Sequence, residues 1–227
     1  MGELYGLIFD VDGVIGDTEP ANARASIRVF ADMFGMEGVR PEDFELGLGK
    51  GAEEYMRAAA RVHGIKLNED QVEAAVQRRQ ENFLEDLEAE PIAAFPGVLE
   101  LIAAALASED VKPAIATSGG REMSEAILKS AGVPYEKMVY ISGSDVQNKK
   151  PNPEIFLKAA ARLAIEPVRC VVIEDAPGGV EAAKRAGAKC IAVTNSVKAE
   201  ELVAADIVCD SLTTMDLAAI RRLVNQE

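Results

Sequence analysis

The chain has 227 residues, of which 48% are hydrophobic and 27% charged, so its composition is that of an ordinary globular protein and disorder is not expected. Its 24 Lys and Arg residues against 38 Asp and Glu residues give a formal charge of −14. This excess of acid argues against a nucleic-acid partner, because phosphate backbones require clustered cations. The single histidine also excludes Ser-His-Asp, Cys-His and multi-histidine metal chemistry.

Short apolar runs alternate with longer amphipathic segments over most of the chain. Buried strands are predicted at residues 4–9, 113–116, 138–141, 170–173 and 190–193. Apolar residues recur with helical spacing at 98–106 and 155–163, and Gly132 and Gly187 are placed to end two more helices. Strands separated by helices predict an α/β protein with a doubly wound parallel sheet, which is a Rossmann-like fold.

Residues 19–90 interrupt this alternation. They contain four helical patterns and no convincing strand, and they come directly after the first predicted strand. We therefore predict a small all-helical domain at 19–90, inserted into an α/β domain formed by 1–18 and 91–227. Hinges are expected near residues 16–18 and 90–91.

The sequence also bears on compartment and partners. No apolar stretch approaches the ~18 residues that a membrane span requires, and no signal peptide is visible. Cys170, Cys190 and Cys209 are well separated within apolar runs, which is typical of reduced, buried thiols. We expect a cytoplasmic monomer with no membrane or nucleic-acid partner.

Polar residues follow the predicted strands at their carboxyl ends, where doubly wound sheets bind ligands. In strand order they are Asp10 and Asp12, then Thr117 and Ser118, then Lys150, then Glu174 and Asp175. Four carboxylates, one hydroxyl residue and a lysine at one edge of a sheet suit Mg²⁺ and a phosphoryl group. An Asp-x-Asp-Gly segment alone is commonly a turn with solvated acids, so this interpretation depends on all the motifs together.

The order of these motifs resembles that of the haloacid dehalogenase superfamily of phosphotransferases. The residues that carry the resemblance are Asp-Val-Asp-Gly-Val at 10–14, Thr117, Lys-Pro-Asn-Pro-Glu-Ile-Phe at 150–156, and Glu-Asp at 174–175 with Gly-Val at 179–180. The resemblance covers essentially the whole chain. The place of the helical insert is similar to that in the subgroup with β-phosphoglucomutase and phosphoglycolate phosphatase.

The resemblance implies a role for each residue at the sheet edge. Asp10 would be the nucleophile that forms an aspartyl-phosphate, and Asp12 would be the general acid and then the general base. Thr117, the backbone amide of Ser118 and Lys150 would bind the phosphate. Mg²⁺ would be held by Asp10, Glu174, Asp175 and the backbone carbonyl of Asp12. A pair of glycines, Gly178 and Gly179, is expected to let a helix approach the sheet.

Substrate selection in this superfamily belongs mainly to the helical cap. The resemblance implies Glu19, Asn22, Lys50 and Arg79 as candidates, although Lys50 equally fits a solvated loop lysine. The mutases of the subgroup have a histidine at the position of Asn22. We therefore expect an Mg²⁺-dependent phosphatase acting on a small phosphorylated metabolite such as a sugar phosphate. A β-phosphoglucomutase-like mutase and a catalytically silent binding protein on the same fold are the alternatives.

Overall fold

The computed structural model describes residues 4–47 and 51–225. The chain divides into two units, one made of the residues up to Asp17 together with those from Ile92 onward, and the other made of Thr18–Pro91. The first unit contains a six-stranded sheet and the second is helical. Each unit has a hydrophobic core of its own.

The α/β unit is built on a fully parallel sheet with the strand order β3-β2-β1-β4-β5-β6. The strands are β1 (Tyr5–Phe9), β2 (Val111–Ala116), β3 (Val139–Ile141), β4 (Cys170–Glu174), β5 (Lys189–Val193) and β6 (Ile207–Cys209). The prediction of a doubly wound parallel sheet is confirmed. The last strand, β6, was not predicted, because it is three half-buried residues long and gives no continuous apolar signal.

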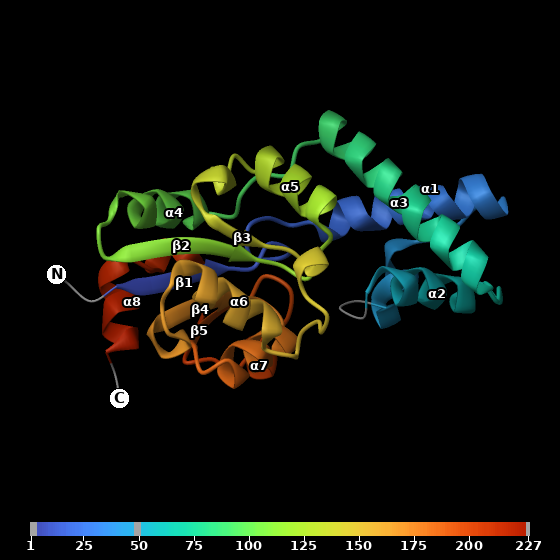
Figure 1. The fold of residues 1–227 in the computed structure, drawn as a ribbon. Helices are drawn as coiled ribbons and strands as arrows, with labels where there is room; N and C mark the ends of the chain where they lie inside the picture. Colours follow the sequence, from blue (N-terminus) through green and yellow to red (C-terminus); the bar gives the residue numbers. More distant parts are fainter. Residues whose placement is uncertain (1–3, 48–50, 226–227) are drawn as a thin grey trace. The chain divides into compact units, whose positions relative to one another are not determined.

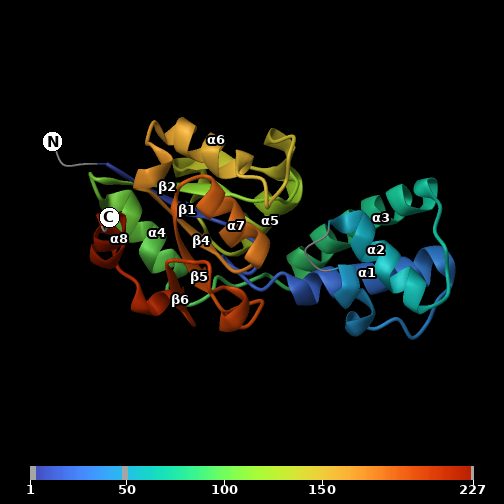
Figure 2. The same ribbon diagram turned by 90° about the horizontal axis from the view of Figure 1, so that it is seen from below.

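Helices cover both faces of this sheet (Figures 1 and 2). They are α4 (Val98–Ala107), α5 (Arg121–Ser130), α6 (Glu154–Leu163), α7 (Pro177–Arg185) and α8 (Leu217–Val224). As predicted, Gly132 and Gly187 follow the ends of α5 and α7, and both have a positive φ, 72° and 83°, which glycine adopts without steric cost. The helices α6 and α7 pack on one face, through Phe156 and Val180, and α4 and α8 lie on the other.

Alternation along the strands decides which residues face α6 and α7. Ile8 of β1 and Val172 of β4 point into the core that these helices cover, and these two residues are partners in the parallel register. Side chains of a strand point to one face at every second residue. The residues that continue this face beyond Ile8 and Val172 are Asp10 and Glu174.

The helical unit consists of α1 (Glu19–Phe34), the 3₁₀ helix η1 (Pro41–Gly47), α2 (Ala52–Val62) and α3 (Glu69–Ala89). The first and the last of the predicted helical patterns correspond to α1 and α3. Asn68 and Gln71 form a capping box that begins α3. Phe30, Phe44 and Met56 are fully buried and form the centre of this unit's core.

The two segments that lead out of the α/β unit lie side by side. The Phe95 N–H donates to the Ile15 carbonyl at 2.7 Å, and Gly16 and Ala94 form an isolated antiparallel bridge. The inserted unit therefore leaves and re-enters the α/β unit at one place.

Within the described residues, no helix is both long and apolar enough to cross a membrane. All three cysteines are free thiols. Cys170 and Cys190 are buried, as expected, whereas Cys209 is only half-buried.

Candidate active site

Lys150 lies between two buried carboxylates. Its Nζ donates to Asp10 Oδ1 at 2.6 Å and to Glu174 Oε1 at 2.5 Å. The Lys150 side chain is 11% exposed, Asp10 10% and Glu174 1%, so water screens these ion pairs little. Two of the predicted strand ends and the predicted lysine are thus brought together.

The sheet explains why these three residues meet. The Asp10 N–H donates to the Ile173 carbonyl at 3.0 Å, which extends the pairing of β1 and β4 by one residue. Asp10 and Glu174 then project from neighbouring strands toward the same face. Lys150 precedes α6, which covers that face, and its Nζ is 4.9 Å from the ring centroid of Phe156 on α6. The order of strands reverses between β1 and β4, and ligands of doubly wound sheets bind at such a switch point.

The Glu174 carboxylate rests on the first turn of α7. Its second oxygen accepts hydrogen bonds from the N–H groups of Asp175 and Ala176, at 3.1 and 3.4 Å. A Cβ atom on Gly179 would lie 1.9 Å from Glu174 Cδ. Gly179 therefore leaves space for the carboxylate itself, which is more specific than the predicted role in packing a helix on the sheet.

Asp175 completes a cluster of three carboxylates. One oxygen from each of Asp10, Glu174 and Asp175 lies within 4.8 Å of the others. Burial, reinforced by the neighbouring Glu174 carboxylate, raises the pKa of Asp175 to about 7. Burial likewise raises the pKa of Asp10 well above its usual range, although Lys150 opposes this shift.

The pKa of Lys150 moves upward. Burial alone would lower this pKa, but the charges of Asp10 and Glu174 and their hydrogen bonds outweigh it. The lysine is therefore charged throughout the neutral range. One ammonium group therefore faces a cluster of three carboxylates.

This donor set fits a hard divalent cation. The oxygens of Asp10, Glu174 and Asp175 are close enough to share one ion, and carboxylate oxygens are the ligands that Mg²⁺ prefers. A cation would also offset the mutual repulsion of these carboxylates, which adds to the effect of burial on the pKa values of Asp10 and Asp175. Asp12 is not part of this carboxylate cluster.

Asp12 and Thr117 both lie close to Gly119. A Cβ atom on Gly119 would lie 3.4 Å from Thr117 Oγ1 and 3.7 Å from Asp12 Oδ2. The Thr117 hydroxyl accepts the Gly119 N–H at 3.0 Å and so shapes the loop that contains Ser118. Gly120 is the N-cap of α5, so Thr117 and Ser118 lie just before this helix.

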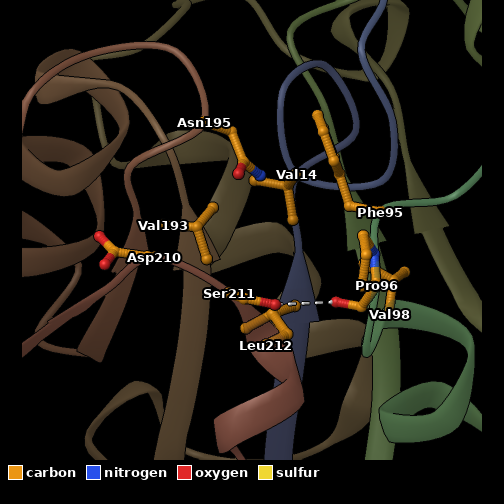
Figure 3. Close-up of a pocket in the computed structure, with 9 residues that line it drawn as sticks. All are labelled: Val14, Phe95, Pro96, Val98, Val193, Asn195, Asp210, Ser211 and Leu212. Carbon is orange, nitrogen blue, oxygen red and sulfur yellow. Dashed lines mark hydrogen bonds between the residues drawn. The ribbon is translucent and has the colours of Figure 1, made fainter.

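The loop after β5 also reaches the site, and the sequence interpretation missed it. The Asn195 side-chain amide donates to the Gly13 carbonyl at 2.7 Å, and the Ser196 hydroxyl donates to Asp175 Oδ2 in a short hydrogen bond. Asn195 also lines a cavity of about 200 Å³, together with Val14 and Phe95 among others (Figure 3). The only available signal was position, because this loop too follows the carboxyl end of a parallel strand.

Three of the four candidate cap residues lie together in the helical unit. The Arg79 guanidinium donates to Asn22 Oδ1 in a short hydrogen bond and lies 5.3 Å from the ring centroid of Tyr55. The Tyr55 hydroxyl donates to Glu19 Oε1 at 2.6 Å. Tyr55, which the sequence interpretation did not select, thus links the predicted residues. Lys50, the fourth candidate, lies outside the described residues.

Comparison with known proteins identifies the family. The model of the haloacid dehalogenase-like hydrolases matches residues 7–193. Hexitol phosphatase A of Escherichia coli is 31% identical over 208 residues, which are 91% of each chain. The chloroplastic protein SUPPRESSOR OF QUENCHING 1 of Arabidopsis thaliana is 37% identical over 86% of this chain, which spans only 18% of that protein's length.

A solved structure supports the same assignment. A variant of CbbY from Rhodobacter sphaeroides, in complex with xylulose 1,5-bisphosphate, has a TM-score of 0.82 and 29% identity, over 96% of this chain and 99% of the other. The family model covers well over half of the chain, and the parallel sheet is the fold that the resemblance implied. The chain is therefore an enzyme that belongs to the haloacid dehalogenase-like hydrolases.

Proposed function

We propose that this protein is an Mg²⁺-dependent phosphatase that hydrolyses a small phosphorylated metabolite, in particular a sugar phosphate, through an aspartyl-phosphate at Asp10. The observation that carries the proposal is the position of Lys150 between Asp10 and Glu174, beside Asp175 and at the switch point of the sheet. In this proposal the α/β unit is the catalytic core and the helical unit is a cap.

In the first half of the reaction, a carboxylate oxygen of Asp10 attacks phosphorus, and the bond from phosphorus to the ester oxygen breaks. Asp12 donates a proton to the departing oxygen, so that the product leaves as a neutral alcohol. In the second half, Asp12 takes a proton from water as the water attacks the aspartyl-phosphate. Phosphate is released and the Asp10 carboxylate is restored.

The other residues make this attack electrostatically possible. An anionic nucleophile must approach an anionic phosphoryl group, and Lys150 offers one positive charge to both. Thr117 and the Ser118 amide would bind phosphate oxygens beside the start of α5, where backbone N–H groups favour an anion. When bound at Asp10, Glu174 and Asp175, Mg²⁺ would supply further charge stabilisation of the transferring phosphoryl group.

The relatives favour a phosphorylated sugar or sugar alcohol. One is named as a hexitol phosphatase, and a solved structure contains xylulose 1,5-bisphosphate. In the cap, Glu19, Asn22 and Arg79 offer a carboxylate, an amide and a guanidinium in one cluster, a combination suited to hydroxyl groups and a second anion. We assign substrate selection to this cluster and to Lys50.

The proposal is tested by a screen for phosphate release from phosphorylated metabolites, with Mg²⁺ and with chelator after bound metal has been removed. We expect sugar phosphates among the best substrates and no release with chelator. Equal release under both conditions would contradict the metal assignment. Conversion of β-glucose 1-phosphate to glucose 6-phosphate without phosphate release would favour the mutase, a result we do not expect with Asn22 in place of a histidine.

A further inference from the structure

The loop that follows β5 joins two catalytic loops that come from other strands. Asn195 donates to the carbonyl of Gly13, in the loop after β1, and Ser196 donates to Asp175, in the loop after β4. Figure 3 shows Asn195 extending from its own loop toward the loop that carries Val14. Neither residue belongs to a motif that identified the family.

Both polar groups of Gly13 are held. Its N–H donates to the Gly16 carbonyl at 3.1 Å, and its own carbonyl accepts from Asn195 at 2.7 Å. The peptide that joins Asp12 to Gly13 is planar and trans, so fixing the Gly13 N–H also fixes the direction of the Asp12 carbonyl. The predicted backbone ligand of the metal is therefore held in place by its neighbours.

The three loops meet without spare space. Gly13 has a φ of +73°, and a Cβ atom there would lie 1.9 Å from Asp175 Oδ2 and 2.5 Å from Ser196 Oγ. Asp175 is only 5% exposed. Burial alone does not fix the plane of its carboxylate, because the torsion about the last side-chain bond of Asp is broad. The Ser196 hydroxyl binds Oδ2 and so fixes that plane, which orients the other oxygen of Asp175.

We propose that Ser196 and Asn195 are positioning residues for the divalent cation: Ser196 orients the Asp175 carboxylate, and Asn195 fixes the Gly13 turn that directs the Asp12 carbonyl. This inference rests on the proposed Mg²⁺ dependence. Hydrogen-bond partners of metal ligands hold the ligands in the geometry of the bound ion, and their loss typically costs 10–100-fold in metal affinity.

Affinity for Mg²⁺ is the direct readout. We expect titration calorimetry with Mg²⁺ on the full chain, without substrate, to give a dissociation constant about 10-fold higher for Ser196→Ala and for Asn195→Ala than for the wild type. Ser196→Thr keeps the hydroxyl and is expected to restore the affinity. Thr194→Val is the matched control. It removes a hydroxyl from the same loop, but this hydroxyl donates to Asp210 at 2.8 Å and not to a residue of the catalytic loops.

A kinetic measurement separates positioning from general damage. Higher Mg²⁺ is expected to restore kcat in Ser196→Ala, with the KM for substrate unchanged at saturating metal and the metal-free melting temperature equal to that of Thr194→Val. Wild-type Mg²⁺ affinity in either alanine variant overturns the role of that residue and leaves the proposed function standing. If the wild-type protein itself binds no Mg²⁺, both this inference and the metal dependence of the proposed function are wrong.

Discussion

At the scale of single residues, removing the charge of Asp10 tests whether this residue is the nucleophile. Asp10→Asn keeps the shape of the side chain and an oxygen that can accept from Lys150, but it removes the nucleophilic carboxylate. We expect phosphate release to fall by at least about 1,000-fold while the melting temperature remains close to that of the wild type. Near-normal turnover in the folded variant would contradict the covalent mechanism.

The raised pKa of Asp175 makes the stability of the metal-free protein depend on pH. This pKa rises to about 7 in the folded state, mainly through burial, against about 3.9 in an unfolded chain. A raised pKa means that the folded state binds the proton more tightly. The stability contributed by this group is therefore complete below pH ~4 and is lost as the pH rises through about 7.

Mg²⁺ competes with that proton, so its effect depends on pH in the opposite sense. We expect the gain in melting temperature on adding Mg²⁺ to be larger at pH 8 than at pH 5, because the carboxylates must be deprotonated to bind. Taking the difference with and without Mg²⁺ at each pH cancels the titration of groups far from the site. An equal gain at both pH values would show that Asp175 does not hold the ion.

The sequence allowed prediction of some of these residues and not of others, for a physical reason. Charged residues are unusual directly beside a buried apolar strand, because burial removes their solvation. The sequence shows such residues at Asp10, Asp12, Lys150, Glu174 and Asp175. Ser196 and Asn195 are residues that any turn accepts. Their role depends on which loops lie beside theirs, and the order of β1, β4 and β5 in the sheet decides that.

At the scale of elements, the junction of β4 and α7 leaves no space for a side chain at position 179. Gly179→Ala would place a methyl group 1.9 Å from Glu174 Cδ, and this carboxylate cannot move easily because Lys150 and two N–H groups hold it. We expect a loss of about 1–3 kcal/mol in the free energy of unfolding, together with weaker activity. Denaturant titration measures the first effect.

Gly178 offers a control for that substitution. Apart from its chain neighbours and the backbone of its own helix, no atom lies within 4 Å of a Cβ at this position, and the residue is on the same turn of α7. Gly178→Ala is expected to keep or slightly raise stability, since alanine favours a helix more than glycine does. A loss of stability equal to that of Gly179→Ala would mean that helix conformation, and not the space for Glu174, explains the effect.

Elements were predictable where periodicity was long enough. The run at β1 and the spacing in α6 each cover several consecutive core positions, so type and place both follow from the pattern. In β6, Ile207–Cys209 presents three half-buried residues, a signal that any loop can produce. The strand exists because β5 offers it a free edge, which is information from the rest of the sheet.

At the scale of the whole molecule, two separate cores predict separable units. Because Gly16 pairs with Ala94, residues 18–91 can be replaced by a short Gly-Ser linker without stretching the α/β unit. We expect the shortened chain to melt cooperatively and to retain a shift in melting temperature with Mg²⁺. Turnover of a small aryl phosphate should persist, while kcat/KM for the best metabolite substrate should fall.

The control for this excision is the intact chain carrying Arg79→Ala, which alters the helical unit alone. It should reproduce the selective loss of kcat/KM for the metabolite in milder form. A shortened chain that fails to melt cooperatively would show that the α/β unit needs the insert in order to fold.

The place of β1 in the sheet has a consequence for the order in which the chain can fold. This strand is fully buried, yet its partners β2 and β4 come only after the whole helical unit, and in the case of β4 after most of the α/β unit as well. During synthesis the helical unit has all its residues, and can complete its core through contacts close in sequence, while β1 still has no neighbour. The segment Tyr5–Phe9 must therefore wait as an exposed apolar strand, the kind of segment that chaperones protect. The strand that leads to Asp10 is thus the first piece of the sheet to be made and among the last to be enclosed.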